Sequence, residues 1–436
     1  MAMNYINMSS ENQTFYGKDM EPGVVQSVPG PINANDFLQI SKAPDADVPD
    51  DNTDALAKMI ENTITAIEFP KSVTKVGNHG LANRNLITTV RIPARITSIG
   101  DYGFGDCHGL VTIDIPETCT SIGNYAFTRC AIRTLILPDG ATLGTNVCAG
   151  CSSLESVHIP ESLTELPSNT FSTCTSLRTV DIPDSVEVIG SSAFSGCTSL
   201  TSVKLPTSLK TINDHAFFHC GSLSSVSVPE GATEIDNGAF VQSGITSITL
   251  PSTLTKLGTL SSGGSMTTGV FGSCASLSSI NLEDTSITTI CSYTFYACSS
   301  LESITIPDTV STIGEYAFSM GTAPSGGLKA ITVPGSVSAI PKGMCSTCNL
   351  LTSIKLNSGV TTINDSAFSV GGPAGTAYAE SCTIDIPSTV TYINSKAFQG
   401  RGVNEQLTIN IHKASGSISG APWGATGSKV TINWLG

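Results

Sequence analysis

The sequence has few charged residues and little that points to nucleic acid or to a membrane. Only 13% of its 436 residues are charged, and acidic residues outnumber basic ones by 35 to 21. The net charge of −14 excludes the basic footprint that nucleic acids require and disfavours an anionic membrane surface. No transmembrane run exists, and residues 1–11 lack the basic and apolar regions of a signal peptide.

Catalytic motifs are missing as well. The chain contains no G-x-S-x-G elbow, no H-E-x-x-H and no G-x-x-x-x-G-K phosphate loop. His215 and His219 have the i, i+4 spacing of a metal pair on a helix, but they flank Phe217 in an ordinary repeat, which favours surface positions. We therefore expect no enzyme, no cofactor and no metal; a carbohydrate-active enzyme built on a solenoid is the weakest alternative.

What the sequence has in place of these motifs is a repeat. Proline recurs every 22 or 23 residues, at Pro70, Pro93, Pro116, Pro138, Pro160, Pro183, Pro206, Pro229 and Pro251. A fixed period in this range is typical of a solenoid. Each unit ends in an alternating run such as Thr112–Ile115, which predicts a half-buried strand that the proline ends. One unit cannot bury its apolar side alone, so the units must stack.

The apolar positions repeat with the same period. Phenylalanine recurs at Phe104, Phe127, Phe171, Phe194, Phe217, Phe240, Phe271, Phe295, Phe318, Phe368 and Phe398. By register, Cys148 and Cys345 take this position in two further units. We expect all of these side chains to point inward, with local repacking where a ring is missing because protein interiors are close-packed.

The fourteen cysteines follow the repeat too. Nine stand three residues after the phenylalanine position, at Cys107, Cys130, Cys151, Cys174, Cys197, Cys220, Cys274, Cys298 and Cys348. Neighbouring turns would bring them within disulfide distance, but a parallel ladder points them the same way, so we interpret them as buried small apolar residues. Cys148-x-x-Cys151 and Cys345-x-x-Cys348 also have the spacing of zinc ligands, but each pair is the phenylalanine position followed by the cysteine position of the repeat, so the register explains the spacing without a metal.

The full pattern is P-x-S-V-x-x-I-G-x-x-A-F-x-x-C-x-S-L-x-x-[IV]-x-[IL]-P over roughly residues 60–412. It resembles the BspA-like class of leucine-rich repeats. This resemblance implies a leucine-rich-repeat solenoid of about fifteen coils, an α/β repeat fold rich in parallel strands with short helical or 3-10 turns. It also implies a bacterial or protist surface protein that binds matrix proteins, host cells or other microbes, and it supplies no catalytic residues.

Three parts follow from the extent of the repeat. Residues 1–55 form a non-repeat arm and linker, in which the acidic run at 45–54 suits a solvated linker better than a calcium site. Residues 56–412 form the solenoid, with a helix at 53–62 placed to cap its first coil. Residues 413–436 form a C-terminal cap, and both tryptophans, Trp423 and Trp434, should cover the last coil.

The regularity of the repeat breaks after Pro251. Insertions appear at about 258–270, 319–327, 370–381 and 399–406, and the last three follow an inward phenylalanine. Insertions of this kind map to loops on one face, often the binding face; neutral surface drift is the alternative. The residues predicted to contact a partner there are Met320, Tyr378, Glu380, Arg401 and Asn404.

These features favour a non-enzymatic recognition or adhesion protein that meets a protein or glycan on a cell surface. The missing export signal and the N-terminal arm suggest a virion-associated, phage-borne component, such as a tail, baseplate or capsid decoration protein. Its arm would dock on a larger assembly or on itself, and a homo-oligomer is possible. The Gly-Ala-Pro-Trp-Gly stretch resembles closing segments of repeat proteins from gut bacteria and their phages. The alternative is a secreted or cell-surface bacterial adhesin.

Overall fold

The computed structural model describes residues 66–69, 73–260, 268–321, 326–372 and 376–436, together with the backbone of three short strands. These three are β1 (Tyr5–Asn7), β2 (Thr14–Phe15) and β3 (Leu38–Gln39). The predicted capping helix at 53–62 and the acidic run at 45–54 lie outside the described residues. The chain forms two compact units, residues 1–206 and 207–436, and the predicted limits of the arm, solenoid and cap stay predictions.

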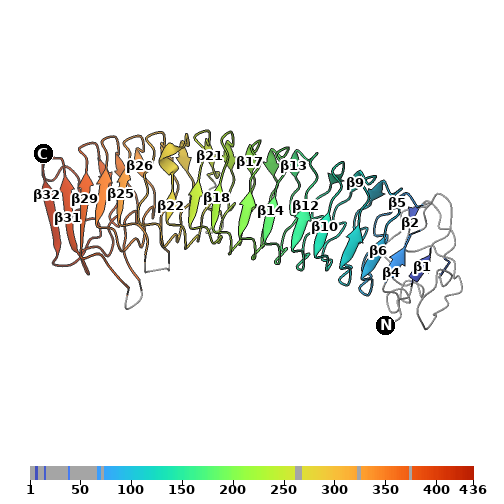
Figure 1. The fold of residues 1–436 in the computed structure, drawn as a ribbon. Coiled ribbons are helices and arrows are strands. Elements are labelled where there is room, and N and C mark those ends of the chain that lie inside the picture. Colours follow the sequence, from blue (N-terminus) through green and yellow to red (C-terminus); the bar gives the residue numbers. More distant parts are fainter. Residues whose placement is uncertain are drawn as a thin grey trace. The chain divides into compact units, whose positions relative to one another are not determined.

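Each unit is a β-solenoid in which most described turns supply one longer and one shorter strand; the turn that contains Leu301 and Ile306 has no long strand. The long strands of the first unit are β4 (Ala66–Glu68), β6 (Thr89–Arg91), β8 (Thr112–Asp114), β10 (Thr134–Ile136), β12 (Ser156–His158), β14 (Thr179–Asp181) and β16 (Ser202–Lys204). Its short strands are β5 (Lys75–Val76), β7 (Ser98–Ile99), β9 (Ser121–Ile122), β11 (Thr142–Leu143), β13 (Glu165–Leu166) and β15 (Val188–Ile189). Strands of successive turns lie side by side (Figure 1) and pair in parallel.

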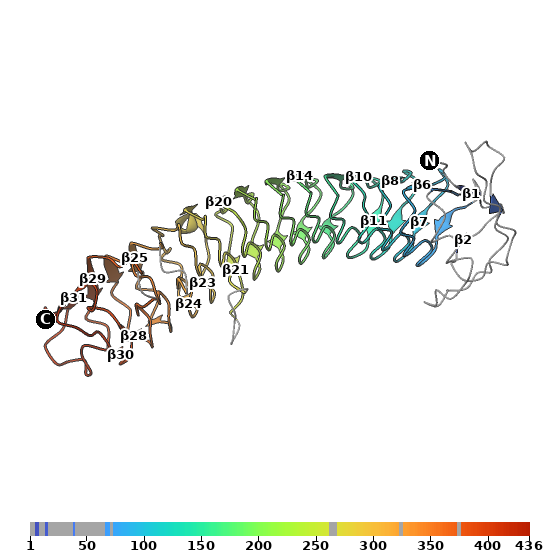
Figure 2. The ribbon, with the colours of Figure 1, turned by 90° about the horizontal axis from the view of Figure 1, so that it is seen from below.

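The second unit repeats this plan with longer strands toward its end. Its long strands are β18 (Ser225–Ser227), β20 (Ser247–Thr249), β22 (Ser279–Ile280), β25 (Ala330–Val333), β27 (Ser353–Leu356), β29 (Ser381–Ile386), β31 (Gln406–Ile411) and β32 (Val430–Trp434). Its short strands are β17 (Thr211–Ile212), β19 (Glu234–Ile235), β21 (Lys256–Leu257), β23 (Thr289–Ile290), β24 (Thr312–Ile313), β26 (Ala339–Ile340), β28 (Thr362–Ile363) and β30 (Tyr392–Ile393). In each unit the long strands follow one side and the short strands the other (Figure 2).

The predicted β-rich solenoid is confirmed, and helical structure is scarcer than we expected. The described residues contain one 3-10 turn, η1 (Leu282–Asp284). The other corners are tight turns because successive turns of the chain pack too closely for helices. At Gly100, for example, an added Cβ would lie 2.7 Å from the backbone nitrogen of Asn78 in the preceding turn. The amide of Asp101 instead donates to Oδ1 of Asn78 at 2.9 Å, and Asn124 repeats this bond on Asp101 at 2.7 Å.

The phenylalanine column forms the core of both units, as predicted. All eleven rings are nearly or fully buried, and neighbours stack face to face, for example Phe104 on Phe127 with centroids 5.6 Å apart. Cys148 and Cys345 fill the two gaps and are fully buried. Trp423 ends the column against Phe398, with ring centroids 6.3 Å apart in an edge contact, whereas Trp434, predicted to cover the last coil with it, lies in the final strand and is only partly buried.

The cysteine column lies beside the rings. All fourteen thiols are free and buried. Most of the nine repeat cysteines donate their S–H to a backbone carbonyl one turn earlier, usually that of the phenylalanine; Cys197 donates to Phe171 O at 3.1 Å. Burial raises the pKa of Cys197 to about 12. The repeat therefore places at this position a small apolar side chain that can also satisfy a buried carbonyl.

Candidate functional site

Three of the four insertions leave the same part of the repeat. The segments 319–327, 370–381 and 399–406 each lie between the phenylalanine turn and a long strand, namely β25, β29 and β31. The described ends of the first two leave one edge of the second unit (Figure 1). The insertion at 258–270 differs, because it follows the short strand β21 and precedes Phe271. We call the three segments 319–327, 370–381 and 399–406 the C-terminal rim.

The first rim segment closes over Met320. This side chain is only 2% exposed, although its place two residues after Phe318 is a surface position in most other turns. The cause is the returning half of the segment: Gly327 packs so closely that an added Cβ would lie 2.6 Å from Sδ of Met320. Met320 therefore packs beneath Gly327, and its predicted contact with a partner stays a prediction.

The second rim segment is held by Asn349, a buried amide. Its Nδ2 donates to the carbonyl oxygen of Gly371 at 2.9 Å, and its Oδ1 accepts from the amide of Gly371 at 3.2 Å. At the other end of the segment, the amide of Ala379 donates to the Asn349 carbonyl at 2.9 Å. One side chain and its own backbone thus fix both ends of the segment, leaving Tyr378 half-buried and Glu380 exposed.

The third rim segment is held by Arg401, which is fully buried. Arg401 stands three residues after Phe398, the position that cysteine takes in other turns. Its Nε donates to the carbonyl oxygen of Phe368 at 2.9 Å, which is the bond that the thiols make one turn apart. In the preceding turn Gly371 stands at the cysteine position and has no side chain to donate a hydrogen bond. Nη2 of Arg401 donates instead to the carbonyl oxygen of Cys348, at 3.3 Å. The guanidinium therefore satisfies carbonyls of two successive turns.

The remaining nitrogen of Arg401 pairs with Glu405, whose side chain is only 1% exposed. Nη1 lies 2.9 Å from Oε1 and 3.1 Å from Oε2. Burial raises the pKa of the Glu405 carboxyl, while Arg401 and the amide of Gly402 act against that rise. The pair ties the start of the segment to the residue before β31. Val403 and Asn404, between them, are exposed at the surface.

The five residues predicted from the sequence thus divide into two groups. Tyr378, Glu380 and Asn404 lie at the surface of the rim, while Met320 and Arg401 lie beneath it. Sequence reasoning missed Val403, which is 51% exposed, and the buried residues Asn349 and Glu405. The register of the repeat already placed Arg401 in the buried cysteine column, but nothing in the sequence marked Glu405 as its partner.

A second surface feature is a column of aromatic side chains three residues after the short-strand isoleucine or valine. In the first unit His79, Tyr102 and Tyr125 stack with centroids 4.9 and 4.6 Å apart. In the second unit Tyr293 and Tyr316 stack at 5.3 Å, and Nζ of Lys342 lies 5.9 Å from the centre of the Tyr316 ring. The rings continue the turn-to-turn stacking of the core on the outside of each unit.

This aromatic column stands on unfavourable backbone. Tyr102, Tyr125, Tyr293 and Tyr316 have φ between 52° and 60°, a left-handed conformation that bulky residues rarely adopt. Asparagine, glycine, serine or histidine takes the same position, also with positive φ, in other turns, for example Asn146, Gly238 and Ser192. Where tyrosine takes this position, its ring stacks on the ring of the neighbouring turn, which helps to offset the cost of the backbone conformation.

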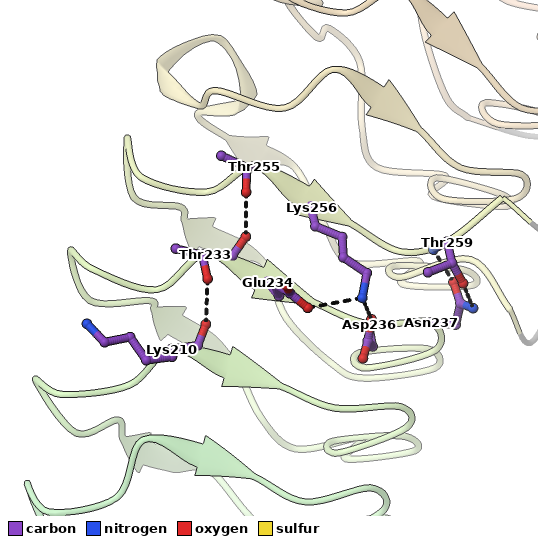
Figure 3. Close-up of polar contacts among 8 residues, drawn as sticks. All are labelled: Lys210, Thr233, Glu234, Asp236, Asn237, Thr255, Lys256 and Thr259. Atoms are coloured by element: carbon purple, nitrogen blue, oxygen red, sulfur yellow. Dashed lines mark hydrogen bonds and ion pairs between the residues drawn. The ribbon is translucent and has the colours of Figure 1, made fainter.

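The short-strand side of the second unit carries polar pairs that satisfy one another (Figure 3). Lys256 lies 2.7 Å from Asp236 and 3.0 Å from Glu234, and these carboxylates raise the pKa of its ammonium group, Asp236 most strongly. Hydroxyls of Thr255 and Thr233 donate to carbonyls one turn earlier. Such exposed pairs contribute little stability.

The histidine pair that the sequence singled out packs against an aromatic ring. His215 and His219 lie against the ring of Phe218, with centroids 5.4 and 6.0 Å apart. Within the part of the chain that the structure describes, no group of histidine, cysteine and carboxylate side chains could hold a metal ion, and no helix has the length and apolar character to cross a membrane.

The parallel turns, the phenylalanine column and the cysteine column together define a leucine-rich-repeat solenoid. A family model described as BspA type leucine rich repeat region (6 copies) matches residues 32–151, 141–262 and 264–404. The chain therefore belongs to this family, as the repeat pattern predicted. Proteins of this family and fold are generally non-enzymatic.

One solved structure supports the same fold, and a second is similar in sequence. A leucine-rich repeat protein from Bacteroides ovatus is 25% identical over 79% of this chain and 84% of its own, with a TM-score of 0.66. A leucine rich cell surface protein from Faecalibacterium prausnitzii is also 25% identical, over 81% of this chain and 89% of its own, with a TM-score of 0.45. A comparison with curated protein sequences finds no match.

Proposed function

We propose that this chain is a non-enzymatic recognition protein whose C-terminal rim meets a protein or glycan on a cell surface. The observation that carries the proposal is the way the rim is fixed. Buried Asn349 holds both ends of one segment, and the buried pair of Arg401 and Glu405 holds the next. Loops that are ordered before binding lose less conformational entropy on binding, which favours affinity.

The exposed chemistry of the rim suits contact with a macromolecule. Tyr378 supplies an amphipathic ring, Val403 an exposed apolar group, and Asn404 and Glu380 supply polar groups at the margin. Aromatic side chains with polar surroundings are typical of the residues that dominate binding energy. The long-strand side of the first unit offers small hydroxyls and scattered charges in comparison, which favours the rim as the site.

Family membership supports a place on the outside of a bacterial cell, because BspA-type repeat proteins are often cell-surface proteins. We therefore propose an outward-facing adhesin. The phage-borne location that the sequence favoured remains a prediction. Both locations require the same recognition step, so the binding test below addresses the shared part.

The test is binding of fluorescently labelled protein to bacterial cells, epithelial cells and immobilised matrix proteins. We expect the variant Tyr378→Ala/Val403→Ala/Asn404→Ala to bind at least about tenfold more weakly than wild type, the loss expected for hot-spot residues. Ile136→Ala is the matched control, since Ile136 is 60% exposed on a long strand of the first unit. Equal loss in the control, equal binding by the rim variant, or no binding to any surface would refute the proposal.

A further inference from the structure

Tyr125 is the last ring of the aromatic stack in the first unit. One face of this ring lies on Tyr102 in the preceding turn, with centroids 4.6 Å apart and planes 6° from parallel. The other face is turned toward the following turn, whose Thr145 carbonyl accepts a hydrogen bond from the Tyr125 amide. Among the described residues, no aromatic ring and no cationic group lies over this second face.

The corresponding stack of the second unit is covered. Tyr316 stacks on Tyr293 in the same way, but Nζ of Lys342 in the following turn lies 5.9 Å from the centre of the Tyr316 ring. Gly343 in that turn also packs closely, since an added Cβ would lie 2.3 Å from Cε1 of Tyr316. The open face of Tyr125 therefore belongs to the first unit and is not a property of every tyrosine stack.

The row of side chains becomes shorter after Tyr125. Asn146 and Asn169 take the same position in the next two turns, on the same left-handed backbone, with φ of 58° and 57° against 58° for Tyr125. Their side chains therefore leave the backbone in the direction that the ring takes, but they end well short of its hydroxyl. We call the open ring face of Tyr125 and the two asparagines after it the Tyr125 shelf: the ring is its wall and the amides are its floor.

The amides of the floor are available to a ligand. Within the part of the chain that the structure describes, neither Asn146 nor Asn169 makes a side-chain hydrogen bond, and both residues are half-buried. Asn124 shows the contrast, because its Oδ1 accepts from the amide and the hydroxyl of Thr145 at 2.8 and 3.1 Å. An amide side chain offers two donated hydrogen bonds and an acceptor oxygen, so the floor can pair with several hydroxyl groups.

Arg129 borders one side of the shelf. Its side chain packs on Gly150, in the same turn as Asn146, where an added Cβ would lie 2.7 Å from Cγ of Arg129. Its Nε lies 2.8 Å from Oδ1 of Asp106, while 62% of the arginine side chain is exposed. The two charges that border the shelf therefore cancel, and the outer N–H groups of the guanidinium remain as donors. This arrangement disfavours both a cation and an anion as the ligand.

We propose that the Tyr125 shelf binds a hexopyranose unit of a glycan. The face of an aromatic ring carries partial negative charge, which attracts the polarised C–H groups on one side of a pyranose ring. The sugar hydroxyls then find donors and acceptors on Asn146, Asn169 and Arg129. An apolar peptide side chain on the same ring would take water from both amides without replacing its hydrogen bonds, which is costly. The shelf lies in the first unit and does not depend on the role proposed for the rim.

The experiment is fluorine NMR of the full chain labelled with 3-fluorotyrosine and titrated with the methyl glycosides of glucose, galactose, mannose and N-acetylglucosamine. The signal that is missing from Tyr125→Asn identifies the Tyr125 ring. We expect this signal to shift and saturate with at least one sugar, at a dissociation constant on the order of a few millimolar because the ligand has few atoms. The signal of Tyr316, whose ring faces Lys342, should not shift. No saturable shift of the Tyr125 signal with any of the four sugars would overturn the proposal.

Matched variants separate the shelf from general effects, with saturation transfer from protein to sugar as the readout. Tyr125→Asn introduces the residue that the next turn carries at this position, so the left-handed backbone is kept, and sugar binding should fall at least about tenfold. Tyr316→Asn makes the same change in the second unit and should leave sugar binding unchanged. Asn146→Gly/Asn169→Gly removes only the amides and should weaken it about fivefold.

The same variants are made in the background of the rim variant, so that a sugar held at the rim does not contribute to the transfer. The rim variant alone should keep its sugar binding at the shelf, and its cell binding is a separate readout, so either proposal can fail alone. Tetramethylammonium tests a cation on the ring face. Sugar binding that survives Tyr125→Asn in this background, or tighter binding of tetramethylammonium than of every sugar at Tyr125, would contradict the proposal.

Discussion

Arg401 and Glu405 form an ion pair that solvent hardly reaches, with Nη1 2.9 Å from Oε1 and side chains 0% and 1% exposed. The pair stands where the repeat otherwise places a thiol. The thiol is uncharged and donates one hydrogen bond. Arg401 at the same position is a cation that donates hydrogen bonds to two carbonyls and to a carboxylate. This exchange lets an insertion of the repeat remain attached to the core.

Removing only one member of the Arg401–Glu405 pair should destabilise the folded protein. Arg401→Met leaves the Glu405 carboxyl buried without its partner, and we expect the free energy of unfolding to fall by about 3–5 kcal/mol. Replacing both groups in Arg401→Met/Glu405→Leu should cost clearly less, because no charge then remains buried. Urea unfolding followed by circular dichroism measures both values. A double variant at least as unstable as the single one would show that the pair is not the source of the cost.

The same pair predicts that the free energy of unfolding depends on pH. Burial raises the pKa of Glu405 above its ordinary value, so the folded protein holds this proton more tightly than the unfolded chain. The contribution of the carboxyl to the free energy of unfolding is therefore fully present below the ordinary pKa of about 4.3 and is lost as the pH rises through the folded pKa.

Glu405→Gln removes this titration and isolates its effect. The stability of wild type relative to Glu405→Gln should decrease as the pH is raised from about 4 to 7. Glu380→Gln makes the same substitution at an exposed rim position and is the matched control. Urea midpoints at several pH values provide the measurement, and a relative stability that rises over this range would be the contrary result.

The thiols should be inert while the chain is folded. All fourteen are buried, and burial raises the pKa of Cys107 and Cys197 to about 12 and that of Cys274 to about 11. The thiolate is the reactive form, so we expect almost no reaction with a disulfide reagent at pH 8. In denaturant all fourteen should react. Rapid modification of several thiols in the folded protein would contradict the buried column.

The ring column should carry much of the stability. Phe295 is 1% exposed and stacks between Phe271 and Phe318 at 5.6 and 5.4 Å. Phe295→Ala should lower the free energy of unfolding by about 3–5 kcal/mol, because it removes the ring and leaves a cavity. Ile136→Ala, at an exposed site, should change it by less than about 0.5 kcal/mol. Denaturant titrations of the two variants give the comparison, and equal effects would exclude a packed column.

The repeat made most of the fold predictable from the sequence. A proline every 22 or 23 residues fixed the length of the turn, alternation before it identified the long strands, and the phenylalanine and cysteine registers identified the core. The tyrosine stacks could have been found in the same way, because Tyr102 and Tyr125 occupy one register position. Short-range regularity is sufficient wherever each turn contacts only its neighbours.

The rim was less predictable, since insertions interrupt the register. Met320 occupies a surface position by register, but the segment returning through Gly327 covers it. Arg401 was expected at the surface as a charged residue, whereas its register position is that of a buried cysteine. Glu405 compensates the charge from within the insertion, and such a long-range pairing cannot be derived from a repeat pattern.

Hydrogen–deuterium exchange of the rim tests the central claim most directly. The amides of Ala379, Gln406 and Thr426 donate to Asn349, Glu380 and Arg401 at 2.9 Å each. If the rim is ordered before it meets a partner, peptides containing these amides should exchange slowly in wild type. In Arg401→Met, the peptide containing Thr426 should exchange faster, while one containing Phe295 should be unchanged. Complete exchange of all three peptides at the shortest labelling time in wild type would contradict the account.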